Sequence, residues 1–337
     1  MDIQRHDIAI QRVGTGAELP RLLEELGVPT EAVFDGSGID PASLQPDTRV
    51  PFAALIDLIE RAATLSGFPD FGLRLGLRFR MELHGPVGAL MASAPTLGAA
   101  LEDFETWQRG YSSGAITFVH PWGDDIALGY ALCAGTLTPS PQFYHCVLGI
   151  AVRMIEELTG GAVRPVEGHV SCRASPSVQR LLKFPVRSNQ PRTCLVLPGA
   201  ARAFPLPGYR PAARAELSSR IAQMMQPFAP TEAARVRAAL RKRLMFDRAR
   251  MAEVADELGL HPRTLRRRLA NEETTFEHLR DEVRFALACE LLALTDMDVG
   301  EIAATLAYAS PGVFSEGFRR VRGTSPTDWR RQRSAPA

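Results

Sequence analysis

Apolar positions near the end of the chain follow one pattern twice. In each copy, a glutamate opens a short run of apolar residues at helical spacing, a proline follows, and two more apolar residues stand four apart. The first copy is Glu253, Val254, Ala255, Leu258, Pro262, Leu265 and Leu269, and the second is Glu301, Ile302, Ala303, Leu306, Pro311, Phe314 and Phe318. Equivalent residues lie 48 or 49 positions apart. This repetition predicts one supersecondary unit present in two copies.

Each copy is typical of two helices joined by a tight turn. In the first copy, Gly259 suits the left-handed backbone that ends a helix, and Pro262 suits the first position of the next helix. When Leu265 and Leu269 face the core, the arginines beside them face outward. One such unit is about as often a plain pair of surface helices. Two copies at a fixed spacing favour a helix-turn-helix that reads the major groove of DNA.

A long helix is predicted between the two copies, over residues 276–294. Its buried stripe would comprise Phe276, Leu279, Val283, Leu287, Leu291 and Leu294. Thr274 and Glu277 are expected to form a capping box at its start. The helix would span roughly 28 Å at 1.5 Å per residue, comparable to one DNA turn of about 34 Å. It can therefore hold two reading units in successive grooves.

The first two-thirds of the chain mixes helical and strand patterns. Apolar periodicity predicts helices over residues 19–26, 51–65, 71–77, 96–111, 141–158 and 176–182. Apolar runs predict strands over residues 115–120, 125–133, 166–172 and 194–197, the first two as a hairpin. We therefore expect an α+β domain over residues 1–226. Prolines at 227 and 230 mark a boundary, and an all-α domain of two helix-turn-helix subdomains should follow over residues 231–333.

Charge and cysteine content exclude only a few classes of protein and site. The formal net charge is +1, but residues 232–337 hold 19 basic and 16 acidic side chains, a net of +3. The basic run at residues 241–243 is either a phosphate contact or, more often for such runs, a solvated face. The five cysteines are odd in number and none forms a CxxC pair, so they predict reduced thiols rather than a disulfide framework or a zinc site. With no signal-peptide pattern, and only the short, interrupted uncharged stretch 85–101, we expect a cytoplasmic protein without a membrane partner.

Residues 231–333 resemble the AraC/XylS-type transcription regulators. Besides the two copies, the resemblance rests on Arg263-Thr264-Leu265, Arg267-Arg268-Leu269, Phe276, Phe314-Ser315, Phe318-Arg319-Arg320, Gly323-Thr324-Ser325-Pro326 and Trp329-Arg330. It implies two helix-turn-helix subdomains joined by one long helix, which bind adjacent major grooves on one face of double-stranded DNA. We further expect a homodimer, and RNA polymerase is a candidate partner.

The first domain is similar to the effector-sensing, arabinose-binding-type domain of one AraC-type subfamily, which includes amino-acid-utilisation and virulence regulators. Residues 44–51 and 71–76 carry this resemblance, and residues 185–189 and 206–207 fit its later part. The match covers most of residues 15–210. In such relatives the domain binds a small effector or mediates dimerisation. The resemblance thus implies a small-molecule effector for this chain.

The second helix of the first copy supplies the main candidates for reading DNA. Arg263, Arg266 and Arg267 match the family's base- and backbone-contacting positions. Thr264, which points outward beside them, is a further DNA-binding candidate, and Arg268 is assigned to phosphate or to packing. Arginine suits base reading because its fork donates two hydrogen bonds to guanine, with about 1–3 kcal/mol of discrimination.

The second copy departs from this pattern. Its candidate DNA-binding positions are Gly312, Val313, Glu316, Arg319 and Arg320. Glu316 repels phosphate, and Ala307 replaces the turn glycine of the first copy. Arg319 and Arg320, with Arg322 beside them, can contact phosphates. We therefore expect the first copy to carry most of the sequence specificity.

Candidates for an effector pocket come from aromatic and polar residues of the first domain. The set is Trp107, Tyr111, Tyr144 and Arg153, with His84 and His120 as further members. Each alone is more often a core or surface residue, and Arg153 would meet an acidic ligand. We expect no enzyme, catalytic residue, cofactor or metal site. The chain lacks the Pro-Cys-His-Arg motif of DNA-repair methyltransferases, a phosphate-binding glycine loop, and the HExxH and GxSxG motifs.

The sequence therefore predicts a DNA-binding transcription regulator controlled by a small-molecule effector bound in residues 1–226. One alternative remains open. In it, the first domain only dimerises or binds a protein partner, and takes no small molecule.

Overall fold

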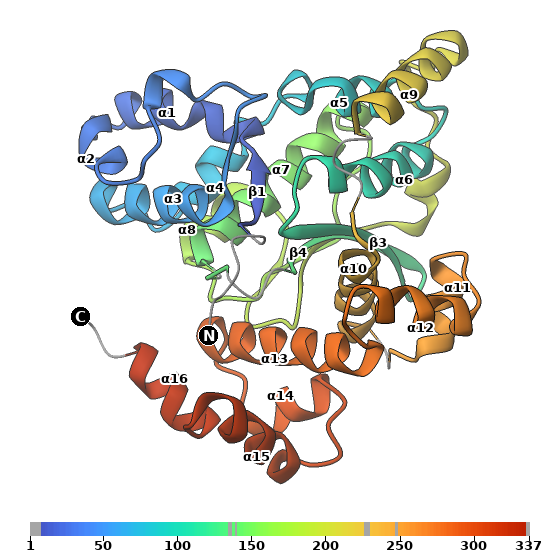
Figure 1. Cartoon of the computed structure of the whole chain (residues 1–337). Helices are drawn as coiled ribbons and strands as arrows, with labels where there is room; N and C mark the ends of the chain where they lie inside the picture. Colours follow the sequence, from blue (N-terminus) through green and yellow to red (C-terminus); the bar gives the residue numbers. More distant parts are fainter. Residues whose placement is uncertain (1–7, 134–136, 139, 226–229, 247–248, 335–337) are drawn as a thin grey trace. The chain divides into compact units, whose positions relative to one another are not determined.

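The computed structural model describes residues 8–133, 137–138, 140–225, 230–246 and 249–334 (Figure 1). The chain divides into two compact units. The first comprises residues 1–130 and 136–229, and the second comprises residues 131–135 and 230–337. Each unit buries its own set of apolar side chains. No helix among the described residues is long and apolar enough to cross a membrane.

Helices make up most of the first unit. They are α1 (Leu19–Glu25), α2 (Thr30–Phe34), α3 (Phe52–Ser66), α4 (Phe71–Gly76), α5 (Gly85–Ala92), α6 (Leu97–Trp107), α7 (Pro141–Thr159), α8 (Pro176–Leu182) and α9 (Pro211–Met225). Short 3₁₀ helices join them: η1 (Gly14–Glu18), η2 (Pro41–Ser43), η3 (Met81–His84), η4 (Gln108–Gly110) and η5 (Gly199–Ala203). The helices predicted from apolar periodicity are confirmed, whereas α2 and α5 carry too weak a stripe to be predicted.

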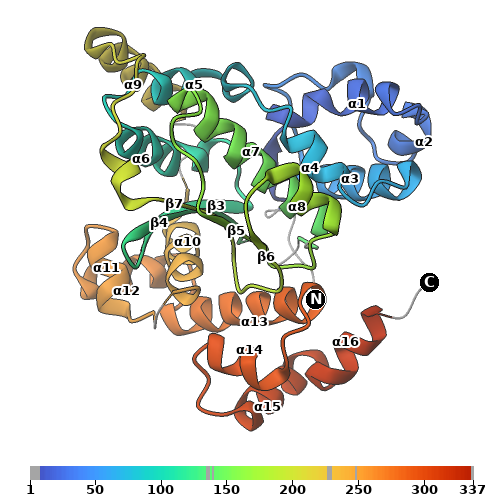
Figure 2. The same cartoon turned by 180° about the vertical axis from the view of Figure 1, so that it is seen from behind.

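Two sheets complete the first unit, which confirms the α+β class. In the small sheet, β1 (Ile10–Arg12) pairs antiparallel with β2 (Arg49–Pro51). The larger sheet has the order β3-β4-β7-β5-β6, built from β3 (Ala115–Trp122), β4 (Asp125–Leu132), β5 (Glu167–His169), β6 (Val186–Arg187) and β7 (Thr193–Leu197). Strand β4 runs antiparallel to β7 and places Gly129 opposite Cys194. Helices α5, α6 and α7 lie on the same side of this sheet (Figures 1 and 2).

Helix α7 is fixed by a glycine-mediated contact with α4. A Cβ added at Gly72 would lie 1.9 Å from the backbone oxygen of Gln142, and one at Gly76 would lie 2.1 Å from that of Cys146. Only glycine therefore permits so close an approach at these two positions. The Gln142 side chain adds two hydrogen bonds, accepting from Gly72 N at 2.9 Å and donating to Pro69 O at 3.1 Å. One face of α7 is thereby held against α4.

Helices are the regular elements of the second unit over its described residues from 230 to 334. They are α10 (Glu232–Leu244), α11 (Met251–Glu257), α12 (Pro262–Asn271), α13 (Phe276–Leu294), α14 (Val299–Thr305), α15 (Pro311–Arg322) and α16 (Pro326–Ser334). The two predicted helix pairs are α11–α12 and α14–α15, and α13 runs between them (Figure 1). Helix α13 has the bounds predicted from its apolar stripe.

The predicted cap of α13 is wrong by one residue. Thr275, rather than Thr274, is the N-cap, and its hydroxyl accepts a hydrogen bond from His278 N at 3.1 Å. Thr275 has the extended backbone of an N-cap, and the chain turns two residues earlier at Glu273, whose φ is +55°. At the start of α14, Asp298 and Glu301 form a capping box.

Candidate nucleic-acid interface and ligand cavity

The first helix pair presents an arginine-rich face on α12. Leu265 and Leu269 are fully buried and hold α12 against α11, which leaves Arg263, Arg266 and Arg267 exposed. The turn before α12 passes through Gly259, whose φ is +67°. His261 then caps the helix by accepting a hydrogen bond from Arg263 N at 3.2 Å.

The arginines of α12 differ in their interactions with other residues of the protein. Arg268 donates to Glu232 of α10 at 2.8 Å, and Arg266 lies 3.6 Å from the sulfur of Met251. No acidic side chain among the described residues pairs with Arg263 or Arg267. Their guanidinium groups are therefore available for a ligand outside the protein, whereas Arg268 contributes to packing between α12 and α10. Thr264 is half-buried next to them.

Ion pairs fix α10 to its neighbours, and all three basic residues at 241–243 take part in them. Arg241, 2% exposed, pairs with Glu290 of α13. Arg243 donates to Glu257 of α11 at 2.8 Å, and Lys242 lies 4.0 Å from the same carboxylate. This run therefore packs the unit together, an outcome that neither reading of the sequence anticipated.

The second helix pair presents a mixed surface on α15. Phe314 and Phe318 are buried, and the outward side carries Gly312, Val313, Glu316, Arg319 and Arg320, all exposed. Val313 is 51% exposed at the start of the helix. The turn before it is strained, because Ala307 has φ +55°, a conformation that costs an L-residue about 1 kcal/mol relative to glycine. Arg322 lies over the Phe285 ring at 5.3 Å, so it is partly committed to packing.

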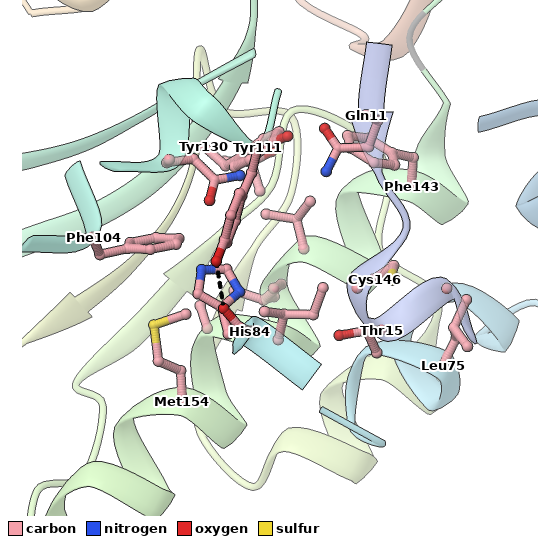
Figure 3. A pocket seen from close by; sticks show the side chains of 18 of the residues that line it. Gln11, Thr15, Leu75, His84, Phe104, Tyr111, Tyr130, Phe143, Cys146 and Met154 are labelled. Carbon is pink, nitrogen blue, oxygen red and sulfur yellow. Dashed lines mark hydrogen bonds between the residues drawn. The ribbon is translucent and has the colours of Figure 1, made fainter. Parts of the chain in front are cut away.

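The first unit contains a partly open cavity of about 100 Å³. Its wall comes from β1 and η1, from α3, α4 and η3, from α6 and η4, from α7, from the middle of β4 and from the first half of β7. A space of this size has room for much more than one water molecule. Figure 3 shows Phe104, Tyr111, Phe143 and Met154 around it, with the Gln11 amide entering from β1. The lining is mainly apolar and aromatic.

A cation at the cavity wall is already compensated. Arg12, 4% exposed, donates from Nε to Asp47 at 2.9 Å and from Nη1 to Leu83 O at 2.7 Å. Its third nitrogen, Nη2, lies 2.8 Å from the same Asp47 carboxylate. The guanidinium also lies 4.6 Å from the centre of the Tyr111 ring. All three nitrogens of Arg12 are therefore engaged within the protein.

Other polar atoms at the cavity have no partner. The side-chain oxygens of Gln11 and Gln108 and Nε2 of His84 are buried without a hydrogen bond among the described residues. Burial, and secondarily the charge of Arg12, lowers the pKa of His84 to about 3, so this ring is neutral near pH 7. The Tyr111 hydroxyl, by contrast, donates to His84 O at 2.9 Å (Figure 3).

The cysteines at the cavity are inert. Cys146 and Cys194 line the wall, and burial raises the pKa of each thiol to about 12. Both are therefore protonated near neutral pH and are poor nucleophiles. Among the described residues there is no group of three or more histidine, cysteine and acidic side chains placed to hold a metal ion.

The structure brings only part of the predicted effector set to this cavity. Tyr111 and His84 line it, whereas Trp107, Tyr144 and Arg153, together with His120, are not among its described lining residues. Arg153 instead pairs with Glu156 and Glu157 on its own helix, at 2.5 Å and 3.0 Å. Sequence reasoning missed Gln11, Arg12 and Gln108, which belong to no apolar stripe or motif and so gave no local signal.

Comparisons with known proteins bear on both units. Residues 27–206 match the family described as the arabinose-binding domain of AraC transcription regulator, N-term. Residues 254–332 match a helix-turn-helix domain family.

Two relatives match along nearly their whole length. An uncharacterized HTH-type transcriptional regulator of Mycobacterium tuberculosis is 28% identical and covers 97% of both chains. The ornithine utilization regulator of Pseudomonas aeruginosa is 26% identical, covering 92% of this chain and 93% of its own. A solved structure, the transcriptional regulator CdpR from Pseudomonas aeruginosa, is 21% identical with a TM-score of 0.46, covering 98% of this chain and 100% of its own.

Proposed function

We propose, from the premise that this chain belongs to the AraC-type transcription regulators, that a small molecule bound in the first unit controls its binding to DNA. The chain is a DNA-binding transcriptional regulator. The observation that carries the effector is the cavity of about 100 Å³ with unpartnered polar atoms in its wall. Buried polar atoms normally have partners, so a cavity that leaves several unpaired is suited to a ligand.

We propose that α12 carries most of the sequence specificity. Arg263 and Arg267 are exposed and unpaired on α12, which supports their role in reading base edges. On α15, Val313 and Glu316 offer fewer hydrogen bonds to bases, while Arg319 and Arg320 are placed to contact phosphates. The proposed DNA-binding domain comprises residues 231–333, and the proposed sensing domain comprises residues 1–226.

The experiment that tests this function compares two alanine-to-leucine variants of the full chain. Ala151→Leu adds a side chain on α7 at the cavity wall, and Ala89→Leu makes the same change at an exposed position of α5. Binding to the DNA upstream of the chain's own coding sequence is measured by fluorescence anisotropy across a salt series. Cell metabolite extract serves as the source of effector.

We expect extract to change the DNA affinity of the wild-type chain and of Ala89→Leu. The DNA affinity of Ala151→Leu should stay the same with and without extract. The salt dependence should be steep, with the logarithm of the binding constant falling by about 0.9 for each phosphate contact per tenfold salt. An equal response of Ala151→Leu and Ala89→Leu would refute control through the cavity. It would favour the alternative in which the first domain serves only for dimerisation or partner contacts.

A further inference from the structure

We propose that the cavity of the first unit takes an uncharged, mainly apolar molecule that carries a hydroxyl or N–H hydrogen-bond donor. This inference rests on the proposed function, since it names the chemical class of the effector. It follows from three properties of the wall: its apolar body, its lack of an available charge, and its unpaired hydrogen-bond acceptors.

The body of the cavity favours an apolar ligand. Phe104, Tyr111 and Phe143 contribute aromatic rings, and Leu128 and Met154 contribute aliphatic contacts. Phe104, Tyr111, Phe143 and Met154 face the same space in Figure 3. A polyol would leave several hydroxyl groups against this surface without partners, which is unfavourable in a water-poor site.

Charge complementarity is missing for ligands of either sign. Among the described lining residues there is no aspartate, glutamate or lysine, so an ammonium group would meet no carboxylate. The guanidinium of Arg12 is held by Asp47 and Leu83 O, so a carboxylate ligand would have to displace an existing partner. An ion buried without a partner is strongly unfavourable. The wall therefore excludes both ammonium and carboxylate ligands.

His84 does not change this balance. Its ring lies among Phe79, Phe104 and Tyr111, with centroid separations of 5.2 to 5.9 Å. Burial in this aromatic setting keeps the ring neutral near pH 7, because its pKa is lowered to about 3. A neutral imidazole offers a hydrogen bond through Nε2 but no charge for an anion.

Hydrogen-bond acceptors in the wall call for a donor on the ligand. Gln108 is 4% exposed and its side-chain oxygen has no partner among the described residues. The side-chain oxygen of Gln11 is also unpaired, while its nitrogen donates to Arg12 O at 2.9 Å. Both oxygens have almost no accessible surface, so a ligand hydroxyl or N–H satisfies them only by shifting the side chains packed over them.

The test uses four molecules with one ring and different substituents. Benzyl alcohol is neutral with a donor, toluene is neutral without one, benzoate is an anion, and benzylammonium is a cation. Binding of each to the full-length chain is measured by titration calorimetry and by the shift in unfolding temperature. We expect benzyl alcohol to bind about fivefold more tightly than toluene, the gain of one hydrogen bond. Benzoate and benzylammonium should bind at least about tenfold more weakly than benzyl alcohol.

Two variants and one control test whether the neutral molecules bind in the cavity and use Gln108. Gln108→Met keeps the length of the side chain and removes its amide, so benzyl alcohol should lose its advantage while toluene binds as before. Ala151→Leu should weaken both neutral molecules, and Ala89→Leu should change neither.

The outcomes separate this inference from the proposed function. Preferred binding of benzoate or benzylammonium that Ala151→Leu abolishes overturns the inference about charge, yet leaves effector control intact. Binding of none of the four molecules to the wild-type chain also overturns the inference. In both cases the proposed function is decided independently, by the response of Ala151→Leu to extract in the DNA-binding assay.

Discussion

Replacing Ala307 by glycine and Gly259 by alanine exchanges the residues at equivalent turns of the two helix pairs. Both positions have left-handed backbone, with φ of +55° at Ala307 and +67° at Gly259. A Cβ added at Gly259 would meet no atom within 4 Å, so that substitution changes backbone preference and little else. The two variants thus measure one effect with opposite signs.

The magnitude follows from two opposing contributions. The left-handed conformation costs an L-residue about 1–2 kcal/mol. Glycine raises the entropy of the unfolded chain, which offsets about 0.4–1 kcal/mol of that. Ala307→Gly should therefore stabilise the second unit by about 0.5–1 kcal/mol, and Gly259→Ala should destabilise it by a similar amount. For a domain of about 100 residues, 1 kcal/mol shifts the unfolding temperature by about 4–8 °C, so shifts of about 2–8 °C are expected.

Differential scanning calorimetry of the full chain is the appropriate assay. The transition of the second unit is identified as the one that added DNA raises, because a ligand stabilises the part that binds it. Ala307→Gly should move this transition up and Gly259→Ala should move it down. Two shifts of the same sign, or no shift in either variant, would refute the attribution of strain to Ala307.

Three further predictions concern other parts of the chain. Arg267→Ala should reduce the free energy of binding by about 1–3 kcal/mol on the preferred DNA and by little on unrelated DNA. Arg320→Ala should weaken binding to the two DNAs equally and reduce the salt slope by about 1. Competition binding measures the two effects, and equal losses of affinity from Arg267→Ala on the two DNAs would contradict its role in reading bases. Gly76→Ala should destabilise the first unit by about 1–3 kcal/mol, because its Cβ would lie 2.1 Å from the Cys146 oxygen. Gly317→Ala, a helical glycine of the second unit with no atom within 4 Å, should leave the transition of the first unit unchanged, and equal first-unit unfolding temperatures for the two variants would argue against a tight contact. Burial lowers the pKa of His145 to about 4, below its unfolded value of about 6.5. The free energy of unfolding therefore has its full value above pH 6.5 and falls as the pH drops toward 4, because the unfolded chain takes up the proton first. About 2 kcal/mol should be lost between pH 7 and pH 5, and urea unfolding of His145→Gln should show a smaller loss over that interval.

The second unit could be predicted closely because its signals are local. Apolar spacing, the turn glycine and the prolines that open α12 and α15 lie within a few residues of the structure they determine. The bounds of α13 followed from its stripe in the same way. The cap at Thr275 was missed because it depends on the backbone of Glu273, two residues earlier, which spacing alone does not specify.

The cavity could not be predicted because its wall is assembled from distant segments. Gln11 and Gln108 lie 97 positions apart and meet only after β1 and η4 have docked. For the candidate Arg153, the local sequence already indicated ion pairs on its own helix. Glu156 and Glu157 follow it at the helical spacings that form such pairs. Tyr144 was a candidate by residue type alone, and it is buried on α7 outside the lining.

The two sides of α7 are subject to different constraints on change. Its contact with α4 passes through backbone atoms at Gln142 and Cys146 and requires glycine opposite them. Its cavity side includes Val147, Ile150, Ala151 and Met154, which follow one another at helical spacing. Substitutions among these four residues can reshape the chamber while the anchor to α4 stays intact. If this cavity binds the proposed effector, regulators of this architecture can diverge in ligand specificity by exchanging a few side chains along a single helix, without altering the contact between α7 and α4.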